Sequence, residues 1–359
     1  MRFERLHVSG LRCLSDVEID LAPGINVFVG ANGAGKTTVL EAMFLLSRGR
    51  SFRSGAKEAL LQRTASELTI FGEIHRANGT RSRVGLGRQG TRWESRLDGD
   101  VVPLGTLVSR CAVVCFEPGS HALIGGAAEE RRRYLDWGVF HVEHDFLNQW
   151  RRYQRALKQR NSLLRSGAST GDALFEPWEI ELAQTAVSID RWRRAYFEAL
   201  RPCLIASARQ LLPELGVPEL RYRRGWPEDS ELIVQLREHR GRDLSRGHTT
   251  LGAHRADWSV GFEQAPVREH LSRGQEKLTA LACLMAQAEL FAARRGEWPL
   301  VCLDDLASEL DSTHQLAVVD QLAAANAQIL VTGTELSAAL KSRAARVFHV
   351  EQGRIARLL

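Results

Sequence analysis

The chain has 359 residues, of which 44% are hydrophobic and 25% charged, a composition typical of a globular protein with more than one domain. No run of about 18 apolar residues is present, so the sequence predicts no membrane span. The first ten residues also lack the apolar core of a signal peptide, and we therefore expect a cytoplasmic protein without a membrane partner. The net charge of +5 allows a nucleic-acid partner without requiring one.

The first third of the chain is predicted to be rich in strands. RFERLHV and DVEIDL alternate in polarity, and INVFVG is a short β-branched run. GANGAGKTT then precedes VLEAMFLLSR, whose apolar residues have helical spacing. Residues 68–98 are predicted to form an antiparallel meander, because three strand-like segments are separated by the turn sequences NGT and GRQG. CAVVCF, residues 111–116, reads as a further buried strand.

The middle of the chain has a different character. Residues 119–240 hold few strand signals and several amphipathic helices, including one through 151–165 and one through 177–212. Strands return with WSVGF, and strand and helix then alternate to the C-terminus, which implies a parallel sheet. We therefore expect an α/β head formed by residues 1–118 and 247–359, with a helical arm, residues 119–246, inserted between its halves.

The stretch GANGAGKT matches the phosphate-binding pattern G-x-x-x-x-G-K-[ST], in the expected context between a strand and a helix. Glycines let backbone N–H groups converge on phosphate oxygens, and the helix presents its positive N-terminus to them. Lys36 is expected to reach the terminal phosphates, and the Thr37 hydroxyl to ligate Mg²⁺. The predicted nucleotide-binding residues are Gly30, Ala31, Asn32, Gly33, Ala34, Gly35, Lys36, Thr37 and Thr38.

Two aspartates follow the apolar strand PLVCL. Phosphate-loop folds use a strand-end aspartate to support Mg²⁺ through water, so Asp304 is predicted for this role together with Thr37. Asp305 is expected to point to the opposite side of the strand end and to polarise the attacking water. Asp305 and Lys36 are therefore the predicted catalytic residues.

A polar sequence, LSRGQ, opens an apolar helix before PLVCLDD, and SELD follows those aspartates. Taken alone, Ser272 would be read as a helix cap. However, the phosphate loop, LSRGQ, the strand that ends in aspartate and SELD follow one another in the same order as the motifs of the ATP-binding cassette (ABC) ATPases, and they resemble those motifs. The resemblance implies a C2 homodimer that ATP closes and hydrolysis opens, because in that family the signature contacts the γ-phosphate bound by a second copy. The residues implied in this contact are Ser272, Arg273, Gly274 and Gln275, with Asp311 in the loop that follows.

Segments spanning nearly the whole chain are similar to the RecF family of bacterial DNA replication and repair proteins. They include HVSGLRCLSDVEIDL, the SFR after the first helix, EERRRYLDWGVFHVEHDF, TTLGAHRAD, LSRGQEK and DDLASELD. The chain departs from the family pattern in the stretch ALIGGAAEERRR, where Ala127 or a neighbour stands at a position that is usually proline. This difference affects a turn rather than the chemistry. The resemblance implies an ABC-type head, with a mixed sheet around the phosphate-loop helix and an antiparallel meander, and it places a basic residue, Arg12, near the nucleotide phosphates.

The same resemblance implies a function in recombinational DNA repair and replication, within the response to DNA damage (SOS). It implies binding of ATP and Mg²⁺, weak DNA-stimulated ATP hydrolysis, and ATP-dependent clamping on single- and double-stranded DNA and gap junctions. RecO and RecR are the implied partners, and loading of RecA is the implied outcome.

Two stretches concentrate positive charge and contain no acidic residue, residues 48–57, which end at Lys57, and residues 146–170. Such stripes neutralise phosphates without reading bases, although a solvated helix face gives the same pattern. Phe146, Trp150 and Tyr153 are expected to belong to the core rather than to stack on bases. The predicted DNA contacts are Arg48, Arg50, Arg53, Arg151, Arg152, Arg155 and Lys158, and Arg160 and Arg165 lie in the same stretch.

Two other classes of phosphate-loop protein remain open. A transporter ATPase subunit would need a membrane partner and would show no DNA stimulation. Gly333 and Thr334 stand where such subunits place a histidine after the strand AQILVT, and Asp305 stands where most carry glutamate. A small-molecule kinase would have no use for LSRGQ and SELD, and a search for a phosphorylated product would detect it.

Overall fold

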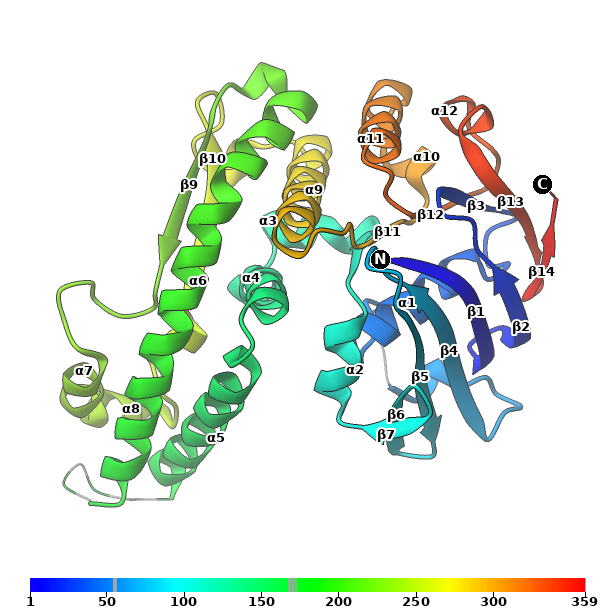
Figure 1. Cartoon of the computed structure of the whole chain (residues 1–359). Helices are drawn as coiled ribbons and strands as arrows, with labels where there is room; N and C mark the ends of the chain where they lie inside the picture. Colours follow the sequence, from blue (N-terminus) through cyan, green and yellow to red (C-terminus); the bar gives the residue numbers. More distant parts are fainter. Residues whose placement is uncertain (54–56, 167–168, 170, 172, 359) are drawn as a thin grey trace. The chain divides into compact units, whose positions relative to one another are not determined.

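In the computed structural model, which describes residues 1–53, 57–166, 169, 171 and 173–358, one sheet carries both segments of the predicted phosphate site (Figure 1). Its strand order is β14 (Arg354–Arg357), β13 (Ala344–Glu351), β3 (Ile25–Val29), β12 (Ile329–Gly333), β11 (Leu300–Leu303) and β8 (Val113–Phe116). The strands from β13 to β8 are parallel, and β14 pairs antiparallel with β13. β11 and β8 are buried at every position, as parallel strands covered on both faces are.

A second sheet is antiparallel throughout and is formed by the first part of the chain. Its order is β2 (Leu14–Asp20), β1 (Arg2–Leu11), β4 (Glu67–His75), β5 (Arg81–Gln89), β6 (Arg92–Leu97) and β7 (Asp100–Val102). Buried and more exposed residues alternate along β4 and β5, so one face packs on the core and the other faces solvent. The predicted meander is therefore confirmed, and the strands predicted from RFERLHV and DVEIDL join it, whereas INVFVG forms β3 of the parallel sheet.

Helices connect the strands of the parallel sheet. α1 (Lys36–Arg48) follows β3 directly, and α2 (Leu104–Arg110) precedes β8. α10 (Leu306–Glu309) and α11 (Ser312–Ala324) connect β11 to β12, and α12 (Ala338–Lys341) precedes β13. Short loops between these elements bring the ends of β3, β12 and β11 to the same edge of the sheet, where ligands bind in open α/β folds.

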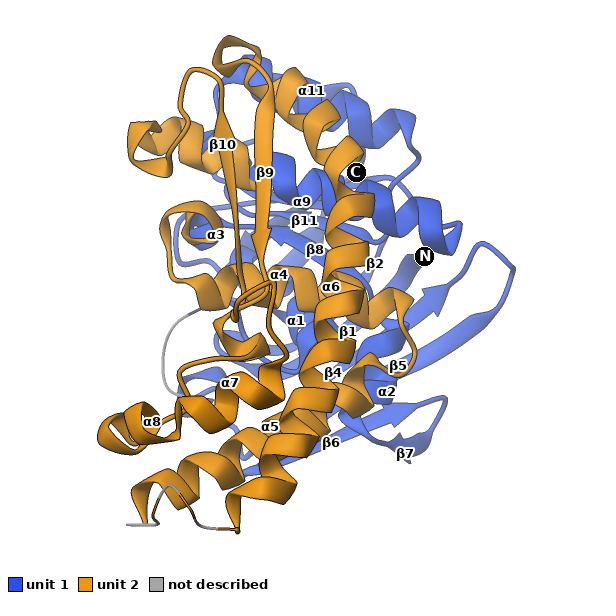
Figure 2. Cartoon of the chain, turned by 90° about the vertical axis from the view of Figure 1, so that its left-hand side faces the viewer, with its two compact units in different colours: residues 1–120, 281–359 blue, residues 121–280 orange. Residues whose placement is uncertain are grey.

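The chain divides into two units (Figure 2). The first joins the two ends of the chain, residues 1–120 and 281–359, and the second comprises residues 121–280. The expected arm ended at residue 246, whereas the second unit runs to residue 280. Helix α9 (Arg273–Arg295), which the LSRGQ sequence opens, crosses this division.

The second unit is mainly helical and also contains a two-stranded ribbon. Its remaining helices are α3 (Ala122–Gly125), α4 (Ala128–Val142), α5 (Phe146–Arg165), α6 (Phe175–Leu211), α7 (Leu232–Glu238) and α8 (Arg240–Arg246). The segment WSVGF, expected in the head, is part of β10 (Asp257–Phe262), which pairs antiparallel with β9 (Pro218–Arg223) in this unit. That expectation was wrong because Trp258 and Tyr222 pack against Phe197 of α6, with ring centroids 6.0 and 5.7 Å away.

Across the described part of the chain, no helix is long and apolar enough to cross a membrane.

Candidate functional site

The loop between β3 and α1 requires glycine at defined positions. Gly33 and Gly35 have φ angles of 80° and 117°, in the left-handed region that other residues disfavour. A Cβ at Gly33 would meet nothing within 4 Å, so backbone conformation rather than crowding requires glycine there. A Cβ at Gly35 would also lie 3.0 Å from Cys13 Sγ. Ala31, Asn32 and Gly33 are exposed, so the tip of the loop is open to a ligand.

Lys36, the first residue of α1, lies inside this loop. Its side chain is buried, and its Nζ donates hydrogen bonds to the carbonyl oxygens of Gly30 at 2.8 Å and Ala31 at 2.9 Å. The loop thus folds around an ammonium group, beside N–H groups at the positive end of α1. An anion bound by those N–H groups would meet Lys36 directly.

Thr37 and Asp304 meet at the carboxyl edge of the parallel sheet. Thr37 Oγ1 donates a hydrogen bond of 2.8 Å to Asp304 Oδ1, and Thr332 Oγ1 donates one of 2.7 Å to the same oxygen. Burial raises the pKa of Asp304, while these two hydrogen bonds oppose the rise by stabilising the carboxylate. Thr332 was not predicted, although its strand β12 lies between β3 and β11 in the sheet.

Asp305 has an unusual backbone conformation. Its φ of 51° and ψ of 43° are left-handed, which is uncommon and costly outside glycine. Its N–H donates to Thr332 Oγ1 at 2.8 Å, and this hydrogen bond holds the turn in place. Asp304 is buried, whereas Asp305 is partly exposed, so the adjacent carboxylates have different surroundings.

The oxygen donors of Thr37 and Asp304 suit a Mg²⁺ ion rather than a metal held by protein ligands alone. Thr37 and Asp304 offer a hydroxyl and a carboxylate, the hard donors that Mg²⁺ prefers. No group of three or more His, Cys, Asp or Glu side chains that could hold a metal occurs among the residues described. Such a sparse set fits an ion that takes its other ligands from water and phosphate.

Arg12 lies near α1 but is engaged with a carboxylate. Its Nε and Nη2 donate to the two oxygens of Glu41 at 2.5 and 2.7 Å. Glu41 is fully buried on α1 and was not predicted as a site residue. Arg53 Nη1 is 3.7 Å from the same carboxylate, so this predicted DNA contact already has a partner.

The LSRGQ sequence forms a reciprocal cap on α9. Ser272 N donates to Gln275 Oε1 at 3.0 Å, and Gln275 N donates to Ser272 Oγ at 3.3 Å. Ser272, Arg273 and Gly274 are exposed. The capping interpretation of Ser272 is therefore correct for the single chain. Asp311 similarly caps α11, accepting from Thr313 N and His314 N at 2.9 and 3.0 Å.

Helix α5 carries an exposed basic face. Arg151, Arg155, Lys158 and Arg165 are exposed at helical spacing, and no ion pair joins them to any other described residue. Arg152 is also exposed, but it forms a bidentate ion pair with Glu181 at 2.6 and 2.8 Å. In the other stretch, Arg50 is exposed, and Arg48 lies 5.4 Å from the ring centroid of Phe44. Lys57 lies outside the described side chains.

Arg160 does not belong to this surface, because it is fully buried. It donates to Glu179 at 3.1 Å, to Asp243 at 2.7 Å and to Thr249 at 2.9 Å. Its grouping with the surface arginines was therefore wrong. Phe146 and Tyr153 are buried, which confirms that they belong to the core, and Trp150 is partly exposed.

The segment TTLGAHRAD contacts α5 through His254 and Tyr153. The Tyr153 hydroxyl lies 2.6 Å from His254 Nδ1 and accepts from the His254 backbone N–H at 3.1 Å. His254 Nε2 is 3.0 Å from the Thr249 carbonyl oxygen, so the neutral ring with a proton on Nε2 satisfies every contact. Burial lowers the pKa of His254 to about 4. The histidine therefore links this segment to α5.

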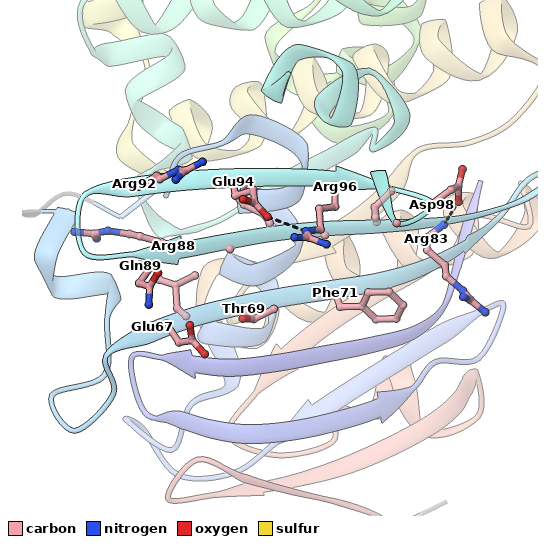
Figure 3. Close-up of a pocket in the computed structure, with 16 residues that line it drawn as sticks. Glu67, Thr69, Phe71, Arg83, Arg88, Gln89, Arg92, Glu94, Arg96 and Asp98 are labelled. Atoms are coloured by element: carbon pink, nitrogen blue, oxygen red, sulfur yellow. Dashed lines mark hydrogen bonds and ion pairs between the residues drawn. The ribbon is translucent and has the colours of Figure 1, made fainter. Parts of the chain in front are cut away.

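The outer face of the antiparallel sheet has a groove of about 500 Å³ (Figure 3). Gly85 and Gly87 of β5 line it, together with residues of the neighbouring strands β4 and β6. Arg96 and Glu94, which line it, form an ion pair at 2.8 Å. The groove shares no residue with the phosphate loop.

Comparison with known proteins identifies relatives along the whole chain. Residues 2–356 match the family model described as the RecF/RecN/SMC N-terminal domain. The chain is 48% identical to the DNA replication and repair protein RecF of Stenotrophomonas maltophilia, over 99% of both chains. It resembles a solved structure of the recombination mediator protein RecF with ATP, with a TM-score of 0.90 at 24% identity, over 99% of this chain and 97% of that one. The Smc head domain of Pyrococcus furiosus is similar with a TM-score of 0.58 at 16% identity, over 99% and 96% of the chains. The expected ABC-type head fold is thus confirmed.

Proposed function

This chain belongs to the RecF family of DNA replication and repair proteins, and we propose that it is an ATP-gated DNA-binding ATPase of recombinational repair. The observation that carries the proposal is the meeting of Thr37 and Asp304, joined by a 2.8 Å hydrogen bond. It brings the phosphate-loop helix and the carboxylate at the end of β11 to one point. Membership of this family supports neither a transporter subunit nor a small-molecule kinase.

Different residues of the phosphate loop have different roles in binding ATP. The N–H groups from Gly30 to Thr38 receive the phosphates, and Lys36 exchanges its carbonyl partners for phosphate oxygens. Thr37 and Asp304 hold Mg²⁺, which neutralises developing charge on the phosphates when bound. Asp305 orients the attacking water and accepts its proton.

A second copy of the chain completes each site. Ser272, Gly274 and Gln275 lie at a capped helix N-terminus, where Ser272 and Gly274 are exposed in the single chain, and a γ-phosphate suits the positive end of this helix. ATP then joins two heads, with Asp311 in the neighbouring loop, and slow, DNA-stimulated hydrolysis releases them. This arrangement makes closure depend on nucleotide.

DNA is the partner of the exposed basic face. Arg151, Arg155 and Lys158 of α5 supply charge that the phosphate backbone attracts, with Arg152, Arg48 and Arg50 contributing less because they have other partners or lie elsewhere. Single- and double-stranded DNA and gap junctions are the proposed substrates. Assistance to RecA loading with RecO and RecR, and action in the cytoplasm, belong to the same proposal, and family membership supports them.

Replacement of Lys36 tests the nucleotide site. Lys36→Met should abolish binding of an ATP analogue in the presence of Mg²⁺, while Lys341→Met, an exposed lysine on α12, should bind normally. Equal binding by both variants would contradict the proposed site.

A further inference from the structure

Glu41 is a buried carboxylate one helical turn after Thr37 on α1. It accepts two hydrogen bonds from Arg12, and Ser51 Oγ donates a further one. Arg53 Nη1 lies 3.7 Å from it. One carboxylate thus faces two arginines, so the cluster keeps an excess of positive charge beside the phosphate loop.

The two arginines are held unequally. Arg12 makes a bidentate pair, the strong form of charge-assisted hydrogen bond. Arg53 approaches the carboxylate at ion-pair distance, and its backbone N–H donates to Ser51 Oγ at 2.9 Å. Ser51 therefore links the backbone at Arg53 to Glu41, and the guanidinium itself is the looser of the two.

Arg53 is also close to the phosphate-loop helix. Glu41, whose carboxylate Arg53 approaches at 3.7 Å, lies one helical turn after Thr37, the residue predicted to ligate Mg²⁺. A bound triphosphate carries several negative charges and would compete with Glu41 for this arginine.

We propose that Glu41 is a positioning residue for ATP hydrolysis, which fixes Arg12 and holds Arg53 ready for the nucleotide phosphates. The inference rests on the proposed ATPase function. It assigns Arg53 to the nucleotide rather than to DNA. Binding of ATP draws Arg53 from Glu41, while the Arg12 pair and Ser51 keep the segment in place.

Variants of Glu41 test this role. Glu41→Gln removes the negative charge and leaves two arginines without their carboxylate partner. Breaking a buried ion pair in this way is strongly destabilising. The double variant Glu41→Gln/Arg12→Gln removes one charge of each sign and is the safer test. In it, affinity for a fluorescent ATP analogue with Mg²⁺ should stay within about threefold, whereas kcat should fall by about tenfold or more. Glu41→Asp keeps the carboxylate and should recover most of the lost kcat.

Hydrogen exchange supplies a readout that a purely structural role would not change. In the wild type, ATP should alter exchange at Ser51, Phe52 and Arg53, and in the double variant this response should disappear. A folded double variant with wild-type kcat would overturn the inference. Proportional losses of affinity, kcat and melting temperature would also overturn it, because they indicate a structural role. If the wild type hydrolyses no ATP, the proposed function fails instead.

Discussion

Thr37 Oγ1 and Asp304 Oδ1 lie 2.8 Å apart although 267 positions separate the two residues in the chain. Parallel pairing of β3, β12 and β11 brings them together, because it sets the carboxyl ends of these strands at one edge. Thr332, on the strand between them, completes the contact.

Replacing Thr332 should impair hydrolysis more than nucleotide binding. Thr332→Val keeps the side-chain shape but removes the hydroxyl that Asp304 and the Asp305 N–H both use. We expect a stability loss of about 1–3 kcal/mol, since buried polar groups lose their partners. We also expect kcat to fall about tenfold. Denaturation and steady-state ATPase assays measure the two effects. Thr332→Ser is the control, and a Val variant with wild-type kcat would refute this role.

His254 should make the protein less stable in acid. Its pKa of about 4 in the folded state lies below the ordinary value of 6.5. Between these values the unfolded chain binds more protons, so stability falls as pH drops from about 6.5 to about 4, by up to about 3 kcal/mol. Chemical denaturation of wild type and His254→Gln across this range isolates the effect from other titrating groups. Parallel curves for the two proteins would show that His254 contributes nothing.

The basic face of α5 should control the salt dependence of DNA binding. Charge reversal to Glu at Arg151, Arg155 and Lys158 should weaken duplex binding. It should also reduce the slope of log affinity against log salt by about 3, roughly one unit for each DNA phosphate that the variant no longer neutralises. A matched variant reverses Arg191, Arg209 and Arg246, which are exposed elsewhere in the same unit. If both triple variants change the slope equally, net charge rather than this face explains binding.

Arg160 should matter for stability and not for DNA contact. Arg160→Met would leave Glu179 and Asp243 buried without their shared cation, at a cost of about 3–5 kcal/mol. At temperatures where the variant remains folded, the salt slope of DNA binding should equal that of the wild type. A reduced slope would place Arg160 on the DNA-binding surface after all.

The sequence predicts those parts of the site whose chemistry is local. The phosphate loop and the aspartates after β11 are visible because a turn or strand end and its functional residues are adjacent in the chain. Thr332 could not be predicted in this way, because its role depends on β12 lying between β3 and β11. Glu41 was missed since helical spacing gives no sign of Arg12 as a partner 29 positions away.

Tertiary partners also explain the expectations that were wrong. Arg160 resembles its surface neighbours in sequence, but Glu179 and Asp243, from α6 and α8, compensate its burial. β9 carries arginines and begins with proline, so its strand pattern is weak, and WSVGF was consequently assigned to the head without its partner strand.

Sedimentation of an Asp305→Asn variant tests the central claim most directly. Its mass would be measured without ligand, with ATP and Mg²⁺, and then with duplex DNA. The account predicts that ATP doubles the mass, that Ser272→Arg abolishes the doubling, and that DNA sediments with the dimer alone. A monomer with ATP bound would contradict it, because the signature would then contact no second nucleotide.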